Sequence, residues 1–396
     1  MAPPVQSRVP PANVLPIDPR DPDPRTLGIA ADVIRGGGLV AFPTETVYGL
    51  GANALDDAAV ARIYQAKQRD AADPLIVHLA DAADLPRVAD GIPPVLQLLA
   101  ERFWPGPLTI VVGRHPRVPD RVSSGRSTVA VRVPAHPVAS GLIAAAGVPI
   151  AAPSANRFMR TSATQAAHVQ ADLGDDIDLI LDGGPTDIGL ESTVVACEPD
   201  NTIRILRPGA VPVEEIVTAL REAGIARAVT VGARGITRTD SSGGDLSPGL
   251  LETHYAPRAR LVLVSGPAPD AIRLMVDQVR GAAETGDRVG LLVFEDDLPA
   301  ISGAVSLGDA AVTVARVGAS SAPEAVAHRL FAALRDLDAA GVTVIVARTT
   351  TPVTYLPGGG PIPGGTGLAR AIDDRLIRAA GSRVVSTAAQ RQTDER

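Results

Sequence analysis

A single lysine, Lys67, stands among the 37 lysine and arginine residues of this 396-residue chain. It lies in QAKQRDAADPLIVH (65–78), at the predicted end of a helix and two residues before Arg69. Cations favour a helix end, but arginine serves there as well as lysine. Lysine offers a compact point charge with three rotatable donors, whereas arginine offers a rigid planar fork. The lone lysine therefore suggests the hypothesis of a site in which a compact ammonium group contacts a phosphate oxygen directly.

Small polar side chains and one arginine lie at the ends or starts of predicted strands. In FPTETVYGLG, Thr44, Glu45 and Thr46 come at or just after the end of a short apolar strand (39–44). Hydroxyl groups at the carboxyl end of a strand are well placed to contact a ligand in an α/β sheet. The further side chains of this kind are Ser154, Asn156, Ser162, Ser192 and Arg207. The residues alone leave a second interpretation open. In it, the hydroxyl and amide side chains only stabilise turns and cap helices, and Arg207 is a solvated surface residue.

Common nucleotide-binding and hydrolase motifs are missing from the sequence. The only lysine follows alanine, which excludes a Walker A loop, and no G-x-G-x-x-G follows an early strand. There is neither HExxH spacing nor a G-x-S-x-G elbow. The single cysteine, Cys197, excludes an internal disulfide and a thiolate zinc site, and we expect it to be a small buried residue. What remains is a set of segments rich in hydroxyl groups and cations.

Charge and hydropathy limit the possible partners. The net charge is −7 and no basic run is present, so we expect no strong direct binding of nucleic acid. No apolar run reaches about 18 residues, so we expect no membrane span. The proline-rich N-terminus lacks the apolar region of a secretory signal. These features predict a cytoplasmic protein.

Helical and strand patterns alternate from residue 27 onward and restart after a stretch rich in Gly, Ser, Pro and Thr. This alternation predicts an α/β fold, with a twisted mixed sheet in the N-terminal domain and a smaller, parallel, Rossmann-like C-terminal domain. The predicted parts are a flexible leader (1–24), an N-terminal domain (25–232), a linker or lid (233–258) and a C-terminal domain (259–396).

Seven segments come in the order found in one family. They are GGGLVAFPTETVYGLGANAL, KQRDAADPLIVH, WPGPLTIVV, VAVRVPAHP, PSAN, GLESTVV and LRPG. Over residues 25 to 215 the chain resembles the YrdC-like threonylcarbamoyl-AMP synthases. SPGLLETHYAPRARL and GLARAIDDRLIRAA further resemble the linker and the C-terminal end of the long, two-domain form.

The resemblance implies a nucleotidyltransferase. Such an enzyme makes L-threonylcarbamoyl-adenylate from L-threonine, bicarbonate or CO2, and ATP, and it releases pyrophosphate. The product feeds the threonylcarbamoyladenosine modification of tRNA, and a separate tRNA-modifying transferase complex carries out the later step. ATP would be the nucleotide substrate, with Mg2+ as the metal ion.

The resemblance also implies roles for individual residues. Lys67 and Arg69 match the K-x-R signature and would be catalytic. The implied ATP contacts are Arg69, Asp73, Thr128, Ser154, Asn156, Ser162, Arg207, His254 and Tyr255. The implied threonine contacts are Thr44, Thr46, His78, Arg132, Ala152 and Ser192. The segment around His254 and Tyr255 would fold over the nucleotide as a lid, and the metal ligands are unknown.

Two residues depart from the family pattern. Asp70 and Asp73 stand where the family usually has proline and asparagine. An acid at 73 either weakens the contact with a triphosphate or helps to hold Mg2+, and the sequence leaves both open.

A general base is not evident in the sequence. A histidine such as His78 ordinarily titrates in a range that suits a general base, but a lone histidine after a buried strand is more often structural.

Two other functions are compatible with an α/β chain. The first is a module that binds double-stranded RNA or tRNA without catalysis, which the net charge of −7 disfavours. The second is an enzyme that carbamoylates a thiol during hydrogenase maturation. Such proteins carry zinc-finger and acylphosphatase segments, and this chain has no cysteine pair.

Overall fold

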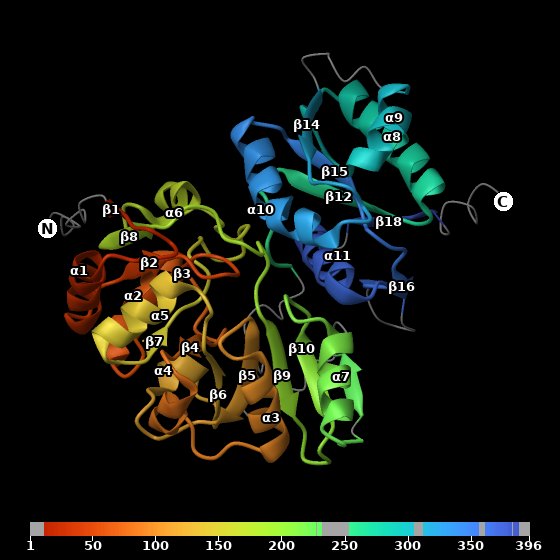
Figure 1. The fold of residues 1–396 in the computed structure, drawn as a ribbon. Coiled ribbons are helices and arrows are strands. Elements are labelled where there is room, and N and C mark those ends of the chain that lie inside the picture. Colours follow the sequence, from red (N-terminus) through yellow and green to blue (C-terminus); the bar gives the residue numbers. More distant parts are fainter. Residues whose placement is uncertain are drawn as a thin grey trace, which may run out of the picture. The chain divides into compact units, whose positions relative to one another are not determined.

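The computed structural model describes residues 12–226, 228–231, 253–304, 312–355, 361–381 and 383–387. The chain divides into two compact units, each with its own aliphatic core (Figure 1). Among the described residues, the first unit contains 12–158 and 163–186, and the second contains 159–162 and the part from 187 onward. The predicted linker lies outside the described residues up to residue 252. The predicted domain boundaries stay predictions.

The first unit alternates strands and helices, as the sequence predicts. Its elements are β1 (Asn13–Pro16), α1 (Pro24–Arg35), β2 (Val40–Phe42), β3 (Gly49–Asn53), α2 (Asp57–Lys67), β4 (Ile76–His78), η1 (Ala82–Arg87), α3 (Pro94–Phe103), β5 (Leu108–Gly113), α4 (Asp120–Ser123), β6 (Thr128–Arg132), α5 (Pro137–Ala146), β7 (Ile150–Ala151), α6 (Ala166–Leu173) and β8 (Leu179–Asp182).

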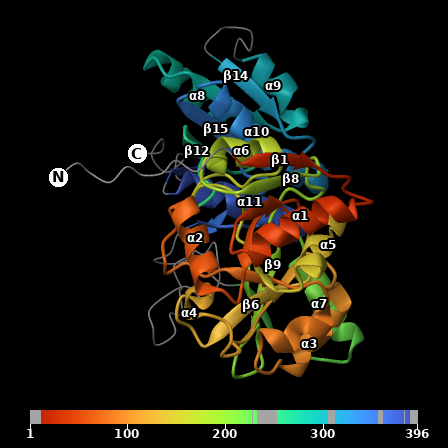
Figure 2. The same cartoon turned by 90° about the vertical axis from the view of Figure 1, so that its left-hand side faces the viewer.

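These strands form a mixed sheet in the order β1-β8-β2-β3-β7-β4-β6-β5. The pairs β1/β8, β2/β8 and β4/β6 are parallel, whereas β2/β3, β3/β7, β4/β7 and β5/β6 are antiparallel. Helices α1 and α5 lie side by side and share a core with β2 through Ile34, Leu142 and Phe42 (Figure 2). The predicted mixed α/β sheet is therefore confirmed.

The N-terminal leader prediction does not hold for residues 13–16. This short segment forms β1, which pairs in parallel with β8 from Asn13 opposite Leu179 to Pro16 opposite Asp182. Its backbone groups are thus paired in the sheet despite the surrounding prolines. Residues 1–11 of the predicted leader lie outside the described residues.

The second unit begins with a small group of strands and continues into a separate sheet. Its elements are β9 (Thr193–Cys197), β10 (Ile203–Arg207), α7 (Val213–Glu222), β11 (Val229–Val231), β12 (Arg260–Ser265), α8 (Ala268–Glu284), β13 (Val289–Val293), η2 (Glu295–Asp297), α9 (Leu298–Ser302), β14 (Val312–Arg316), α10 (Pro323–Ala339), β15 (Val344–Arg348), β16 (Thr354–Tyr355), β17 (Pro361–Ile362), α11 (Gly367–Ala380) and β18 (Val384–Ser386).

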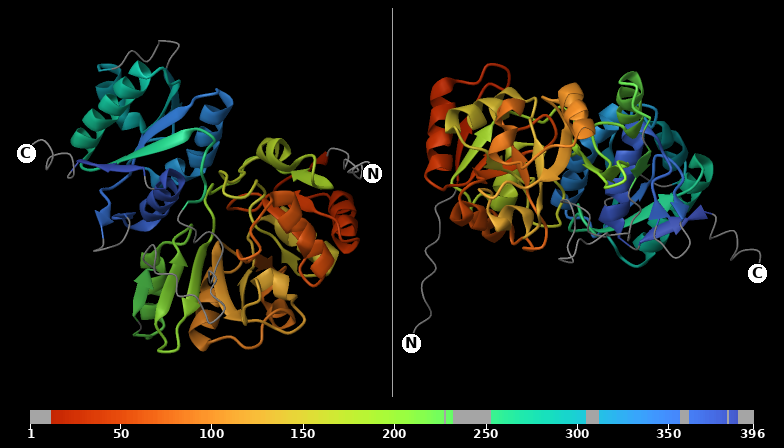
Figure 3. Two further views of the ribbon diagram at one scale, coloured as in Figure 1. Left: turned by 180° about the vertical axis from the view of Figure 1, so that it is seen from behind. Right: turned by 90° about the horizontal axis from the view of Figure 1, so that it is seen from below.

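Five strands of the second unit form an all-parallel sheet in the order β14-β13-β15-β12-β18. Helix α8 packs on one face of this sheet, and α10 and α11 pack on the other (Figures 1 and 3). The predicted parallel C-terminal domain is confirmed, although β14 and β18 were not predicted. One expectation in this unit was wrong, because Cys197 is half-buried at the end of β9.

A buried ion pair ties the end of β15 to the turn after β13. Arg348 donates from Nε and Nη2 to the two carboxylate oxygens of Asp297, at 2.6 and 2.9 Å. The guanidinium lies 4.4 Å from the centroid of the Phe294 ring. Both charged side chains are 4% exposed, and Nη1 of Arg348 also donates to the Thr349 carbonyl at 3.0 Å.

We predict that Asp297→Ala lowers the free energy of unfolding by about 3–5 kcal/mol, because it leaves the Arg348 guanidinium buried without its carboxylate. As a control, Asp32→Ala removes an ion pair between two exposed side chains, Asp32 and Arg35, and should cost about 0–1 kcal/mol. Urea unfolding followed by circular dichroism measures both variants. Equal losses would contradict the role assigned to the buried pair.

Candidate functional site

Lys67, the last residue of α2, is buried, with an exposed fraction of 1%. Its ammonium group donates to the carbonyl oxygen of Ser154 at 2.6 Å and to that of Asn156. Two of its three N–H groups are thus taken by the loop after β7. Burial, and after it the charge of Arg69, lowers the pKa of Lys67. A compact ammonium head suits a position between two carbonyl groups better than a planar guanidinium does.

The same loop makes further contacts with the end of α2. Arg157 Nη1 donates to the carbonyl oxygen of Ala66 at 2.6 Å. The backbone N–H of Phe158 donates to the carbonyl oxygen of Lys67 at 3.0 Å. The K-x-R and S-x-N segments, which lie far apart in the sequence, are therefore in direct contact.

Arg69 is held by the segment that follows it. Its Nε donates to the carbonyl oxygen of Asp73 at 3.1 Å, and its Nη2 donates to that of Pro74 at 2.9 Å. Nη2 also forms an ion pair with Asp73 Oδ2 at 2.8 Å, and both side chains are 4% exposed. The acid that departs from the family pattern thus offsets part of the charge of the cation implied to bind ATP.

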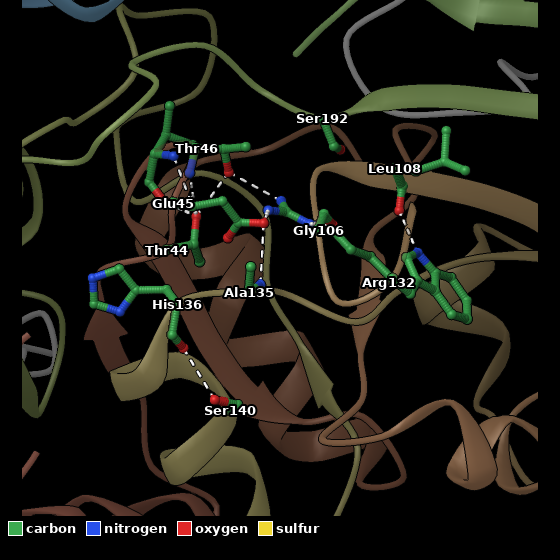
Figure 4. Close-up of polar contacts among 12 residues, drawn as sticks. Thr44, Glu45, Thr46, Gly106, Leu108, Arg132, Ala135, His136, Ser140 and Ser192 are labelled. Carbon is green, nitrogen blue, oxygen red and sulfur yellow. Dashed lines mark hydrogen bonds and ion pairs between the residues drawn. The ribbon is translucent and has the colours of Figure 1, made fainter. Parts of the chain in front are cut away.

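Thr44, Thr46 and Arg132 form one hydrogen-bonded chain (Figure 4). Arg132 Nη1 donates to Thr46 Oγ1 at 3.0 Å, and its Nε donates to the Gly106 carbonyl at 3.1 Å. The two threonine hydroxyls are 2.7 Å apart, and that of Thr44 donates to the Val47 carbonyl at 2.7 Å. The Thr46 hydroxyl must therefore donate to Thr44, which leaves one lone pair on Thr46 Oγ1.

Glu45 completes this cluster, although the sequence reasoning did not select it. Its Oε1 lies 2.5 Å from Arg132 Nη2 in an ion pair and accepts the Ala135 N–H at 3.2 Å. Its side chain is 9% exposed. An acid between two threonines implied to bind substrate was a signal that could have found it.

His78 lies beside Arg132, because β4 and β6 pair in register at these two residues. Burial, and then the charge of Arg132, lowers the pKa of His78 to about 3. The ring is therefore neutral near pH 7 and is a weak base, which favours a structural role over base chemistry.

Ala152, also implied to contact threonine, donates its N–H to the carbonyl of Ile76 in β4 at 2.9 Å. Thr128 lies at the other end of β6 from Arg132.

Ser162 lies in the second unit and is held by a buried charge network. Its hydroxyl donates to Glu191 Oε1 at 2.5 Å. Arg375, on α11, donates from Nε to Glu191 Oε2 at 2.8 Å and from Nη1 to the Pro208 carbonyl at 3.0 Å. Burial alone would raise the pKa of Glu191, but the charges of Arg375 and Arg207 lower it. The sequence analysis predicted no role for Glu191 or Arg375. Its only signal for α11 was the resemblance of the segment GLARAIDDRLIRAA to the C-terminal end of the two-domain form.

Arg207, at the end of β10, is buried, so its interpretation as a solvated arginine was wrong. Its Nε and Nη2 donate to the Ser192 carbonyl at 3.2 and 3.0 Å, and Nη2 also donates to the Ser192 hydroxyl at 3.2 Å. The antiparallel pairing of β9 and β10 brings the two residues together. The residues implied to bind threonine belong to both units: Ser192 lies in the second unit, whereas Thr44, Thr46 and Arg132 lie in the first.

His254 and Tyr255, implied to belong to a lid, are buried in the second unit. Their ring centroids are 4.0 Å apart. The Tyr255 ring stacks on Phe331 at 5.7 Å, and the guanidinium carbon of Arg375 lies 5.0 Å from its centroid. Most of the predicted lid lies outside the described residues.

Metal-binding and membrane-spanning features were also sought in the part of the chain that the structure describes. It contains no group of three or more His, Cys, Asp or Glu residues that could hold a metal ion. None of its helices is both long and apolar enough to cross a membrane.

Two family models match the chain in succession. The Sua5–YciO–YrdC model, described as telomere recombination, matches residues 32–209. The model of the threonylcarbamoyl-AMP synthase C-terminal domain matches residues 211–381. Together they cover both units.

Individual relatives match over most of their length. The threonylcarbamoyl-AMP synthase of Pyrococcus abyssi is 41% identical over 90% of this chain and 94% of its own. That of Bacillus subtilis is 39% identical over 90% and 93%. A crystal structure of P. abyssi Sua5 complexed with L-threonine has a TM-score of 0.79 and 38% identity and covers 95% of this chain and 99% of its own. The chain therefore belongs to the threonylcarbamoyl-AMP synthase family.

Proposed function

We propose that the chain synthesises L-threonylcarbamoyl-adenylate from L-threonine, CO2 or bicarbonate, and ATP, with release of pyrophosphate. It is thus a nucleotidyltransferase that serves the threonylcarbamoyladenosine modification of tRNA. The observation that carries this proposal is the 41% identity, over 90% of the chain, to a threonylcarbamoyl-AMP synthase. The match to a relative complexed with L-threonine supports threonine as the amino acid.

The reaction brings two anions together, since a carbamate must attack the α-phosphorus of ATP. Transfers of this kind depend mostly on positioning and on fixed positive charge. Lys67 and Arg69 supply that charge in the first unit. Two N–H groups of Lys67 fix the loop with Ser154 and Asn156, and the third is available to a phosphate oxygen.

Arg132 binds the threonine carboxylate in this proposal. Its Nε, one N–H of Nη1 and one N–H of Nη2 face Gly106, Thr46 and Glu45, so one N–H on each terminal nitrogen remains for a carboxylate. The other implied contacts stay predictions: Thr44, His78, Ala152 and Ser192 for threonine, and Asp73, Thr128, Ser154, Asn156, Ser162, Arg207, His254 and Tyr255 for ATP.

Mg2+ would reach the site on the phosphates of ATP, which commonly supply several of its oxygen ligands. Asp73 is the candidate protein ligand, and its carboxylate is paired with Arg69. The alternative of an RNA-binding module without catalysis is not favoured, because the relatives are named as synthases. The cytoplasmic location and the downstream tRNA-modifying transferase complex stay predictions.

The role of Lys67 is tested by two substitutions. We predict that Lys67→Ala lowers kcat for threonine- and bicarbonate-dependent pyrophosphate release at least about 100-fold, because it removes the charge and frees the loop. Lys67→Arg keeps the charge but should still lose about tenfold, because a guanidinium does not fit between the two carbonyls. The exposed Arg117→Ala is the control. An arginine variant as fast as the parent would show that the choice of lysine is unimportant.

The role of Asp73 is tested by Asp73→Asn. We predict that this variant lowers the KM for ATP by about threefold, or about 0.7 kcal/mol, because Arg69 is no longer partly neutralised. Asp70→Asn makes the same charge change at a neighbouring exposed position and should leave the KM unchanged. If Asp73→Asn instead raises the Mg2+ concentration needed for half-maximal rate, Asp73 is a metal ligand.

A further inference from the structure

Glu45 and Arg132 are adjacent in the cluster that they form with Thr44 and Thr46. The buried Oε2 of Glu45 has no hydrogen-bond partner among the described residues. The two side chains form an ion pair, with 2.5 Å between Nη2 and Glu45 Oε1 (Figure 4). A buried carboxylate oxygen without a donor is rare and costly, so we expect a donor from outside the chain at Oε2.

The two side chains differ in charge and in hydrogen-bonding role. Glu45 Oε2 is an acceptor on an anion, and the Arg132 guanidinium is a cation with N–H donors. An α-amino acid carries the complementary pair, with N–H donors on its amino group and a carboxylate acceptor one carbon away. A phosphate or another simple anion could contact the Arg132 guanidinium but would leave Oε2 without a donor. The lone pair of Thr46 Oγ1 adds an acceptor beside Arg132, which suits a ligand with a hydroxyl side chain.

We propose that Glu45 accepts an N–H of the α-amino group of threonine and takes up its proton when the amine is carboxylated. This proposal rests on the function proposed above and adds a catalytic residue to it. Arg132 then has two tasks, because it binds the threonine carboxylate and orients Glu45 through the ion pair. The Ala135 N–H donates to the same oxygen, Oε1, and also helps to fix the carboxylate.

The proton-transfer step balances without a further reactant. The α-ammonium of threonine first releases one proton to solvent. The lone pair of the resulting neutral amine forms the C–N bond to CO2, and one C=O π pair moves onto oxygen, which gives a zwitterion with a positively charged nitrogen; loss of a second proton then gives the carbamate anion. One N–H bond breaks, its electron pair stays on nitrogen, and the proton passes to Glu45 Oε2. The carboxylic acid later returns this proton to solvent.

The neighbouring groups are less suited to this task. The Thr46 hydroxyl donates to Thr44, and the Thr44 hydroxyl donates to the Val47 carbonyl, so neither oxygen is a base. His78 holds its proton too weakly to act as a base near pH 7. Glu45 is thus the carboxylate of this cluster that has an oxygen left to accept a proton.

The test compares the two directions of the reaction in Glu45→Gln. Forward synthesis, followed by pyrophosphate release from ATP with threonine and bicarbonate, requires the proton transfer. The reverse reaction, in which purified threonylcarbamoyl-adenylate and pyrophosphate form ATP, ends at the carbamate and needs no proton acceptor at the amine. We expect the forward rate to fall at least about 100-fold and the reverse rate to fall less than about tenfold. The exposed Glu101→Gln is the charge-matched control.

Equal losses in both directions would show that Glu45 only supports Arg132, and an unchanged forward rate would show that it has no role; either result overturns the proposal. If Glu45→Gln does not fold, Glu45→Asp allows the same comparison, because it keeps the charge and withdraws the carboxylate by one methylene. A parent chain without threonine-dependent pyrophosphate release would instead refute the proposed function itself.

Discussion

The site in the first unit depends on a buried positive charge that backbone carbonyls hold in place. The ammonium of Lys67 donates to the carbonyls of Ser154 and Asn156, so α2 and the loop after β7 are joined through one nitrogen atom. Removing an ammonium from water is costly, and for this reason burial lowers the pKa of Lys67. The loop cannot move away without leaving this charge unsatisfied. Its conformation and the position of the charge are therefore determined together.

The other cations of both units are also oriented by the protein itself. The pairs are Arg69 with Asp73, Arg132 with Glu45, Arg207 with Ser192, and Arg375 with Glu191. Fixed groups of this kind stabilise developing charge without reorganising during the reaction, which favours transfer between anions. The acceptors also make buried arginines tolerable within each unit. In the proposed function, the same acceptors set how much positive charge remains for a substrate, which is the role proposed for Asp73 and part of that proposed for Glu45.

Much of the fold could be predicted from periodicity, because strands and helices that bury one face show it in their apolar pattern. Helix α7 (Val213–Glu222), which buries Ile216, Ala219 and Leu220, shows such a pattern. The edge strand β14 (Val312–Arg316) begins with alternating Val-Thr-Val but is short and half-exposed, and it was missed. The motifs identified most of the candidate residues, but not Glu45. Its partner Arg132 is distant in the sequence, and no local spacing reveals such a pair. The acceptors of Lys67 are backbone atoms, which leave no signal in side-chain types.

The most direct test uses the fact that the chain has one lysine. In full-length protein labelled with nitrogen-15 lysine, the side-chain Nζ resonance reports on Lys67 alone. We predict that this resonance titrates below the usual lysine pKa of about 10.4, exchanges slowly with solvent, and shifts when ATP is added. A resonance that exchanges rapidly, titrates near the usual value and does not respond to ATP would contradict the buried, loop-bound ammonium.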